Sequence, residues 1–252
     1  MSRLIKVAIL NKSTVVEDDQ LRPIVEALQS QVFHDFRATW GITAELALLP
    51  KGSPNPQDCY WLGVFDNSDQ AGALGYHDLT PQGFPVSKVF AETDLKYGAK
   101  LSVTCSHELL EMLGDPFVNL TALDPSSGRL YAYEASDAVE ADELGYGING
   151  ITVSDFVLPQ YFDPQHAGKG VRLSYAGHVI QPFALARGGY LSYLDLNDLK
   201  AGWQQETAQM AEGAGGPEGF RQAGFPPGSR RERRVRAAKS ELLTSEPVDA
   251  EG

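Results

Sequence analysis

Apolar positions along the first half of the chain follow two distinct patterns. The short run at residues 4–10 is rich in Ile, Leu and Val, which is typical of a buried strand. Across residues 18–40 the apolar side chains recur at helical spacing and Gly41 follows, so we expect a long helix that ends at this glycine. Residues 43–49 and 60–65 predict two further strands.

Prolines interrupt the next stretch, residues 72–93, and confine its strand-like pieces to the edge of a sheet. An extended peptide can add to such an edge as another strand. Residues 102–113 predict a second strong helix, because Gly114 and Pro116 stop it. After it we expect strands at 129–134, 148–156 and 171–175, and a short last helix within 194–210.

These patterns predict one α/β domain over residues 1–200, of the α+β kind, in which both long helices pack on a single mixed sheet. A part rich in strands and loops completes it. Residues 201–252 are expected to be a low-complexity tail without a packed core, because Gly, Pro and charge dominate from about Ala211. The basic run RRERRVRAAK, from Arg230 to Lys239, offers a contact for an acidic partner.

The charge and composition of the chain narrow its partners. A net charge of −12 repels phosphate backbones, so we expect no nucleic-acid partner. No apolar stretch approaches transmembrane length, and the run at residues 4–10 is too short for a signal-peptide core. We therefore expect a cytoplasmic protein without membrane contact as synthesised, with leaderless export or association with a larger particle left open. Two cysteines, Cys59 and Cys105, define no disulfide framework.

The candidate chemistry lies on the second helix, in the segment SVTCSHELLEMLGDP. At about 100° per residue, Glu108 lies about 100° and Glu111 about 40° from His107, so the three share one face. Cys105, together with Leu109 and Met112, lies on the opposite, apolar face. The alternative interpretation is a surface helix with a solvated acidic face.

Further residues around this helix are candidates for the same site. Asp115 follows the helix directly, and a second acidic cluster contains Glu134 and Asp137. His77, in the motif GYHD, belongs to the irregular edge segment and is a candidate ligand or oxyanion donor. Asp155 lies in a strand-like run, where a buried carboxylate needs partners.

The segment His107-Glu108-Leu109-Leu110-Glu111 resembles the His-Glu-x-x-His signature of the zincin metallopeptidases, with glutamate in place of the second histidine. The order of strand, backing helix, strands, edge strand and active-site helix also looks zincin-like. The blocks SHELLEMLGDP, YEASDAVEAD and VSDFVLPQYF are similar to uncharacterised bacterial and phage-associated proteins.

The zincin resemblance implies a metal-dependent peptidase. His107 and Glu111 would be metal ligands, joined by Asp115, Glu134 or Asp137, and Glu108 would be the general base. The metal would be zinc, with manganese, iron or calcium open because carboxylates replace nitrogen ligands. Its substrate would be a peptide or protein. His77, Tyr131 or Tyr133 would stabilise the oxyanion.

Two other function classes compete with this one. A catalytically silent zincin-like module of a bacterial or phage assembly would explain the glutamate at position 111 and the tail. A metal-free hydrolase would pair Glu108 with Glu134 on a sugar. A cysteine nucleophile is disfavoured, because Cys105 and His107 face about 200° apart on the helix.

Overall fold

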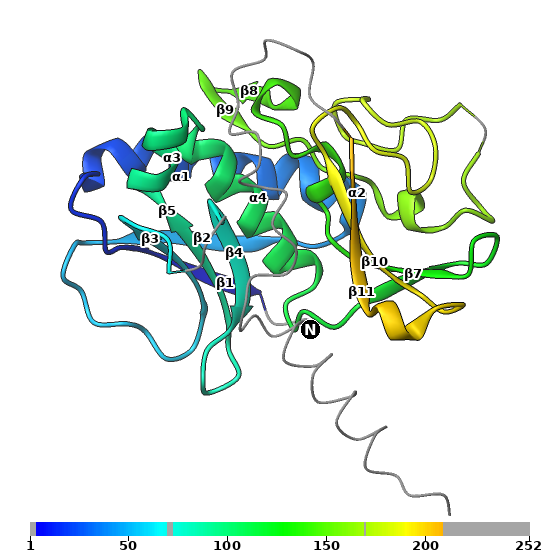
Figure 1. Cartoon of the computed structure of the whole chain (residues 1–252). Helices are drawn as coiled ribbons and strands as arrows, with labels where there is room; N and C mark the ends of the chain where they lie inside the picture. The colour runs from blue at the N-terminus through cyan, green and yellow to red at the C-terminus, as the bar shows by residue number, and fades with distance from the viewer. Residues whose placement is uncertain (1–3, 70–72, 169, 209–252) are drawn as a thin grey trace, which may run out of the picture.

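The computed structural model of the protein describes residues 4–69, 73–168 and 170–208 (Figure 1). Its largest sheet has five strands in the order β2-β1-β3-β5-β4. Those strands are β1 (Ile5–Asn11), β2 (Ala44–Leu49), β3 (Tyr60–Phe65), β4 (Gly75–Leu79) and β5 (Pro85–Phe90). All neighbouring strands run parallel except β4, which pairs antiparallel to β5 at the edge of the sheet. The α+β fold class with a mixed sheet is therefore confirmed.

The long N-terminal helix passes through three helical geometries without a break. It begins as α1 (Asp18–Ser30), widens into a π-helical turn (Gln31–Phe36) and ends as α2 (Arg37–Trp40). Gly41 follows in the left-handed conformation at φ 69°, as the sequence predicted. The buried face of this helix belongs to the same apolar core as the strands.

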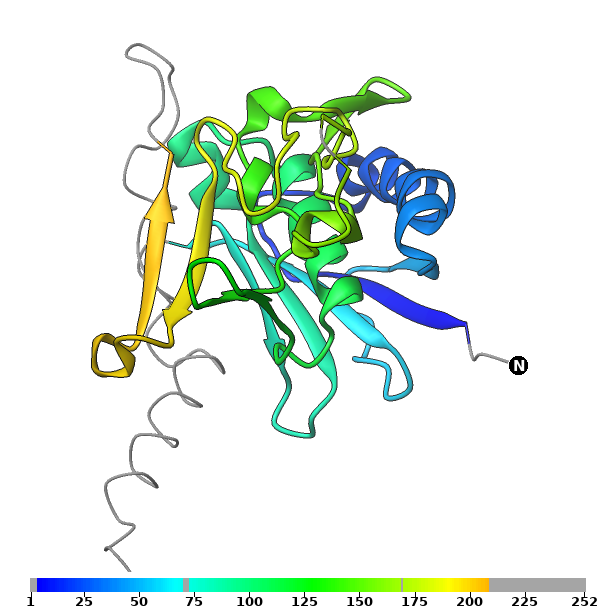
Figure 2. The same ribbon diagram turned by 90° about the vertical axis from the view of Figure 1, so that its right-hand side faces the viewer.

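The second strong helix, α4 (Leu101–Gly114), lies on the same face of the sheet as α1 (Figures 1 and 2). One hydrophobic cluster joins both helices, with Leu21 and Leu28 from the first and Leu109 and Met112 from the second. The expectation that both helices pack on one sheet is confirmed. The short helix α3 (Ala91–Tyr97), which precedes α4, was not predicted, because its sequence has no apolar stripe.

Buried polar contacts fix the position of α4. The hydroxyl of Ser87 on β5 donates to the backbone carbonyl of Glu108 at 2.9 Å. On the other side of the helix, Ser106 donates to Gln31 Oε1 at 2.7 Å and accepts the backbone N–H of Ser154 at 3.0 Å. These bonds restrain both the rotation and the height of α4 above the sheet, because each joins it to a different element.

The second half of the chain forms a smaller layer beside α4. Its strands are β6 (Thr121–Asp124), β7 (Arg129–Ala132), β10 (Tyr190–Asp195) and β11 (Trp203–Thr207), in the order β11-β10-β7-β6, and a separate hairpin of β8 (Tyr146–Ile148) and β9 (Ile151–Val153). Short 3-10 turns lie at Asp137–Val139, Asp142–Leu144, Pro159–Phe162 and Leu199–Ala201. This half has its own aromatic-rich core, and Trp40 packs against both cores.

Three expectations for this half are wrong. The helix expected within 194–210 is replaced by the end of β10, a 3-10 turn and β11, because this stretch pairs as an antiparallel sheet. Residues 171–175 form no strand and only one isolated bridge, Val157 to Ser174. The strand expected at 148–156 is a hairpin, since Asn149 and Gly150 adopt positive φ angles of 51° and 83° and turn the chain.

The basic run and residues 209–252 of the expected tail lie outside the described residues. The expected start of the tail at residue 201 is wrong, because β11 (Trp203–Thr207) pairs with β10. Within the described part of the chain, no helix combines the length and apolar character that crossing a bilayer requires.

Candidate metal centre

The polar face of α4 is buried rather than solvated. His107, Glu108 and Glu111 keep only 8%, 5% and 4% of their surface exposed. The opposite face, with Cys105, Leu109 and Met112, belongs to the main hydrophobic core. The interpretation of this helix as a surface helix with a solvated acidic face is therefore wrong, because strand β4 covers Glu108 and Glu111 and the turn with Asp137 covers His107.

One group of side chains converges from α4 and the 3-10 turn Asp137–Val139. His107 Nε2 lies 3.3 Å from Glu111 Oε2 and 3.2 Å from Asp137 Oδ1. One ligand atom from each of these residues lies within 4.8 Å of the others, and all three side chains are buried. Donor atoms on one ion lie at most about 4.4 Å apart when each bond is about 2.0–2.2 Å long. The group can therefore hold a divalent cation after small shifts.

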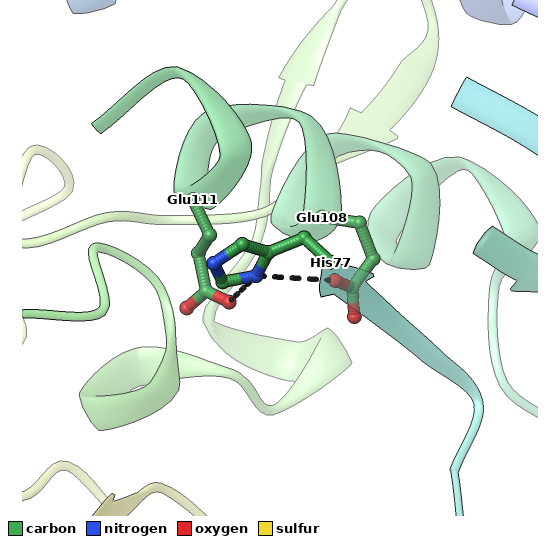
Figure 3. Close-up of side chains that lie close together, drawn as sticks. All are labelled: His77, Glu108 and Glu111. Atoms are coloured by element: carbon green, nitrogen blue, oxygen red, sulfur yellow. Dashed lines mark ion pairs between the residues drawn. The ribbon is translucent and has the colours of Figure 1, made fainter. Parts of the chain in front are cut away.

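A second group forms where the edge strand β4 meets α4. His77 Nδ1 lies 3.5 Å from Glu111 Oε2 and 3.9 Å from Glu108 Oε2. Figure 3 shows the His77 ring next to the two carboxylates that descend from the helix. These three residues also have ligand atoms within 4.8 Å of one another. Glu111 is the residue that the two groups share.

Glu134 approaches the site from behind His77. Its Oε2 lies 3.5 Å from His77 Nε2, the ring nitrogen opposite the one that faces α4. Glu134 belongs to neither of the two groups. The two facing atoms form an ion pair without hydrogen-bond geometry, on the side of the His77 ring that points away from α4.

The electrostatics of the site show how strongly these groups interact. Burial acts to lower the pKa of His77, but the carboxylates of Glu134, Glu111 and Glu108 outweigh it and raise this pKa to about 9. Burial, partly offset by His107, raises the pKa of Glu108 to about 8. Burial and the neighbouring Glu111 also raise the pKa of Asp137 well above its usual range.

In Glu111 and His107, the neighbouring charges shift the pKa in the direction opposite to the effect of burial. The two histidines overcome the effect of burial and hold the pKa of Glu111 well below its usual range. Glu111 and Asp137 likewise overcome burial and raise the pKa of His107 well above its ordinary value. Glu111 Oε1 also accepts the backbone N–H of Ser136 at 3.1 Å, which fixes this carboxylate between the two histidines.

Two acidic candidates have other roles. Asp115 is fully buried at the end of α4, where its Oδ2 accepts the backbone N–H of Leu120 at 2.8 Å. It belongs to neither group, so the structure does not place it as a ligand. Asp155 is also fully buried and accepts the backbone N–H groups of Phe156 and Ala176, each at 2.8 Å. Both carboxylates hold turns together.

The tyrosine beside the candidate metal centre is not one of the expected two. Tyr131 stacks on Phe183 at 4.4 Å between ring centroids, and Tyr133 packs on Phe162 at 4.1 Å. Instead, Tyr190 lies close to Asp137, and burial, followed by the charge of this carboxylate, raises the pKa of Tyr190 well above its usual range. No sequence signal marked Tyr190, which reaches the site only because β10 returns beside the turn that carries Asp137.

Cys105 has no catalytic environment. Burial, followed by the charges of Asp94 and Glu108, raises the pKa of its thiol well above the ordinary value. A thiolate at neutral pH is therefore disfavoured, and the residue packs in the hydrophobic core.

Comparisons with known proteins give no match to a family model, to a curated protein or to a solved structure. The function therefore has to be argued from the site itself, which contains His, Glu and Asp groups able to hold a metal ion.

Proposed function

We propose that this chain is a metal-dependent hydrolase of the zincin-like kind that cleaves peptide bonds. The observation that carries the proposal is the position of Glu108. Its buried carboxylate has an oxygen within 4.8 Å of Glu111, which belongs to the group formed by His107, Glu111 and Asp137, and it lies on the same helix as two of those residues. Three protein ligands with a base beside them are typical of hydrolytic metal sites.

The donor set suits a divalent cation. One imidazole nitrogen and two carboxylate oxygens match zinc, and equally manganese or iron, so the donors leave the choice of metal open. Asp137 Oδ1 is buried and accepts no hydrogen bond. Its one ion-pair partner among the described residues is His107 Nε2 at 3.2 Å, and a cation between the two would add the coordination that this buried oxygen lacks.

A bound cation would polarise the scissile carbonyl and lower the pKa of a coordinated water. The chain supplies the proton transfers. Burial places the pKa of Glu108 at about 8 in the metal-free protein, close to the working range of a general base once a nearby cation lowers it. Glu108 would accept the proton of the attacking water and return it to the leaving amine.

Two further residues stand near the reacting groups. His77, with a pKa of about 9, is cationic at neutral pH in the metal-free protein and can donate a hydrogen bond to a developing oxyanion. The backbone of β4 forms one edge of the main sheet beside α4, where an extended peptide can pair as an additional strand. Together they favour a peptide over a small-molecule substrate.

Cleavage of fluorescein-labelled casein, with and without chelator, tests the proposal. We expect activity that is lost in EDTA and restored by zinc or manganese. Glu108→Gln is the matched variant, since it keeps the shape and removes the base, and it should lose at least about a hundredfold in rate. Cleavage that survives both EDTA and this substitution would contradict the proposal. No cleavage at all, from a chain that binds metal, would favour the silent module.

A further inference from the structure

We infer that the site holds a second divalent cation, bound by His77, Glu108 and Glu111, with Glu111 shared between the two ions. The inference rests on the proposed function, which needs only the ion at His107, Glu111 and Asp137. It concerns the group on the opposite side of Glu111, where the edge strand meets the helix.

The distances fit a separate ion in this second group. Glu111 Oε2 faces both histidines, at 3.3 Å from His107 Nε2 and 3.5 Å from His77 Nδ1. A carboxylate between two such groups can bridge two cations, and bridged pairs lie about 3.5–4 Å apart.

His77 has the surroundings of a metal ligand. Its side chain is 6% exposed, and its Nδ1 faces the two carboxylates of α4. Its Nε2 faces Glu134. Histidine ligands usually donate the second ring N–H to a carboxylate, which fixes the tautomer and turns the free nitrogen toward the ion.

Glu108 supplies an unsatisfied oxygen. Its side chain is 7% exposed, and its Oε2, directed toward His77, is buried and accepts no hydrogen bond. Leaving a buried carboxylate oxygen without a partner is costly, and a cation between it and His77 would remove that cost.

Charge balance supports two ions over one. Glu108, Glu111, Glu134 and Asp137 are all buried within one site, and only His77 and His107 form ion pairs with Glu108, Glu111 and Asp137 among the described residues. When both histidines are neutral ligands, four ionised carboxylates carry four negative charges. With one divalent cation at His107, His77 is not a ligand and can still carry a proton, so one negative charge stays uncompensated, whereas two cations on two neutral histidines neutralise the site.

The second ion has a functional consequence. Once bound, it occupies the Glu108 oxygen that the proposed reaction uses as a base. Hydrolysis should therefore rise as the first ion binds and fall as the second binds, so that excess metal inhibits the enzyme. Binding of the second ion at His77 on the edge strand would then regulate hydrolysis according to the metal concentration.

Equilibrium dialysis of the full chain against Zn²⁺ alone, with metal counted by mass spectrometry, tests the second site. We expect two ions per wild-type chain and one per His77→Gln chain. The control is His166→Gln, which removes an exposed histidine paired with Asp163 and should leave two. Thermal melting verifies that each variant is folded. Glu134→Gln keeps His77 in place and should weaken only the second ion, by about 10–100-fold.

Each other result has a distinct meaning. One ion in the wild type, unchanged by His77→Gln and Glu134→Gln, would overturn the second site and leave the proposed function standing. A single ion that His77→Gln removes would also overturn it. Two ions of which one is lost in His166→Gln would place the extra ion on the surface. No ion in the wild type would reject the proposed function as well.

Discussion

Gly75 on the edge strand lies against the side chain of Glu108 on α4. A Cβ atom at position 75 would stand 2.7 Å from Glu108 Cγ and 2.8 Å from Oε1. Side-chain atoms do not tolerate such distances, so the glycine leaves the space that the carboxylate fills. The placement of the base therefore depends on a residue with no chemistry of its own.

Gly75→Ala should displace Glu108 while leaving the ion at His107, Glu111 and Asp137 in place. We expect a loss of at least about tenfold in the rate of casein cleavage, because misplaced catalytic groups lose much of their effect. Gly147→Ala is the control, since a Cβ there meets nothing within 4 Å. Equal effects of both substitutions on the rate would remove the special role of Gly75.

Glu108→Gln and His107→Ala should separate the roles of base and ligand. The glutamine variant loses turnover and keeps the first ion, because no ligand of that ion changes. The alanine variant loses both, because the only nitrogen donor of the group disappears. Metal analysis beside the cleavage assay distinguishes them. Retention of the first ion in His107→Ala would contradict the ligand assignment.

The metal-free protein should lose stability as the pH rises from about 6.5 to 9. The pKa of His77 is raised from 6.5 to about 9, so its contribution is complete below 6.5 and is lost as the pH passes 9. The pKa of Glu108 is raised from 4.5 to about 8, so the contribution of this buried acid to stability also falls as the pH rises, up to about pH 8. Melting temperatures measured in EDTA test this expectation.

Saturating zinc should flatten or reverse that trend, because metal binding releases protons and is stronger at higher pH. His77→Gln should make the trend shallower, since one of the groups whose pKa is raised is gone. A metal-free melting temperature that rises between pH 6.5 and 9 would contradict the direction assigned to both groups.

Asp115→Ala separates a structural acid from a ligand. The carboxylate is fully buried and accepts the Leu120 N–H at the end of α4, so its removal should lower the free energy of unfolding by about 1–3 kcal/mol. Zinc stoichiometry should stay as in the wild type. A lost ion together with unchanged stability would restore Asp115 to the ligand set.

The sequence predicted the elements whose periodicity is strong. Helical spacing located α4 and placed His107, Glu108 and Glu111 on one face, and the prolines around His77 predicted an edge segment. The burial of that face was not predictable, since it depends on long-range packing of β4 and of the turn with Asp137 against the helix. Short strands in the second half of the chain have weak patterns, which is why residues 194–210 were assigned to a helix.

In the site too, residues close together in the sequence were predictable, and contacts between distant segments were not. Spacing along α4 identified His107, Glu108 and Glu111, because they are close in the chain. Asp115 was a candidate for that reason too, yet the end of the helix turns its carboxylate to Leu120. Choosing Asp137 rather than Glu134 as the third ligand, and finding Tyr190, required long-range geometry.

Anomalous diffraction at the zinc edge, from crystals grown with one equivalent of zinc and no chelator, tests the central claim most directly. The account predicts a peak within about 2.0–2.2 Å of His107 Nε2 and of carboxylate oxygens of Glu111 and Asp137, with Glu108 beside it. A peak elsewhere on the molecule, or no peak with these three side chains directed apart, would contradict the account.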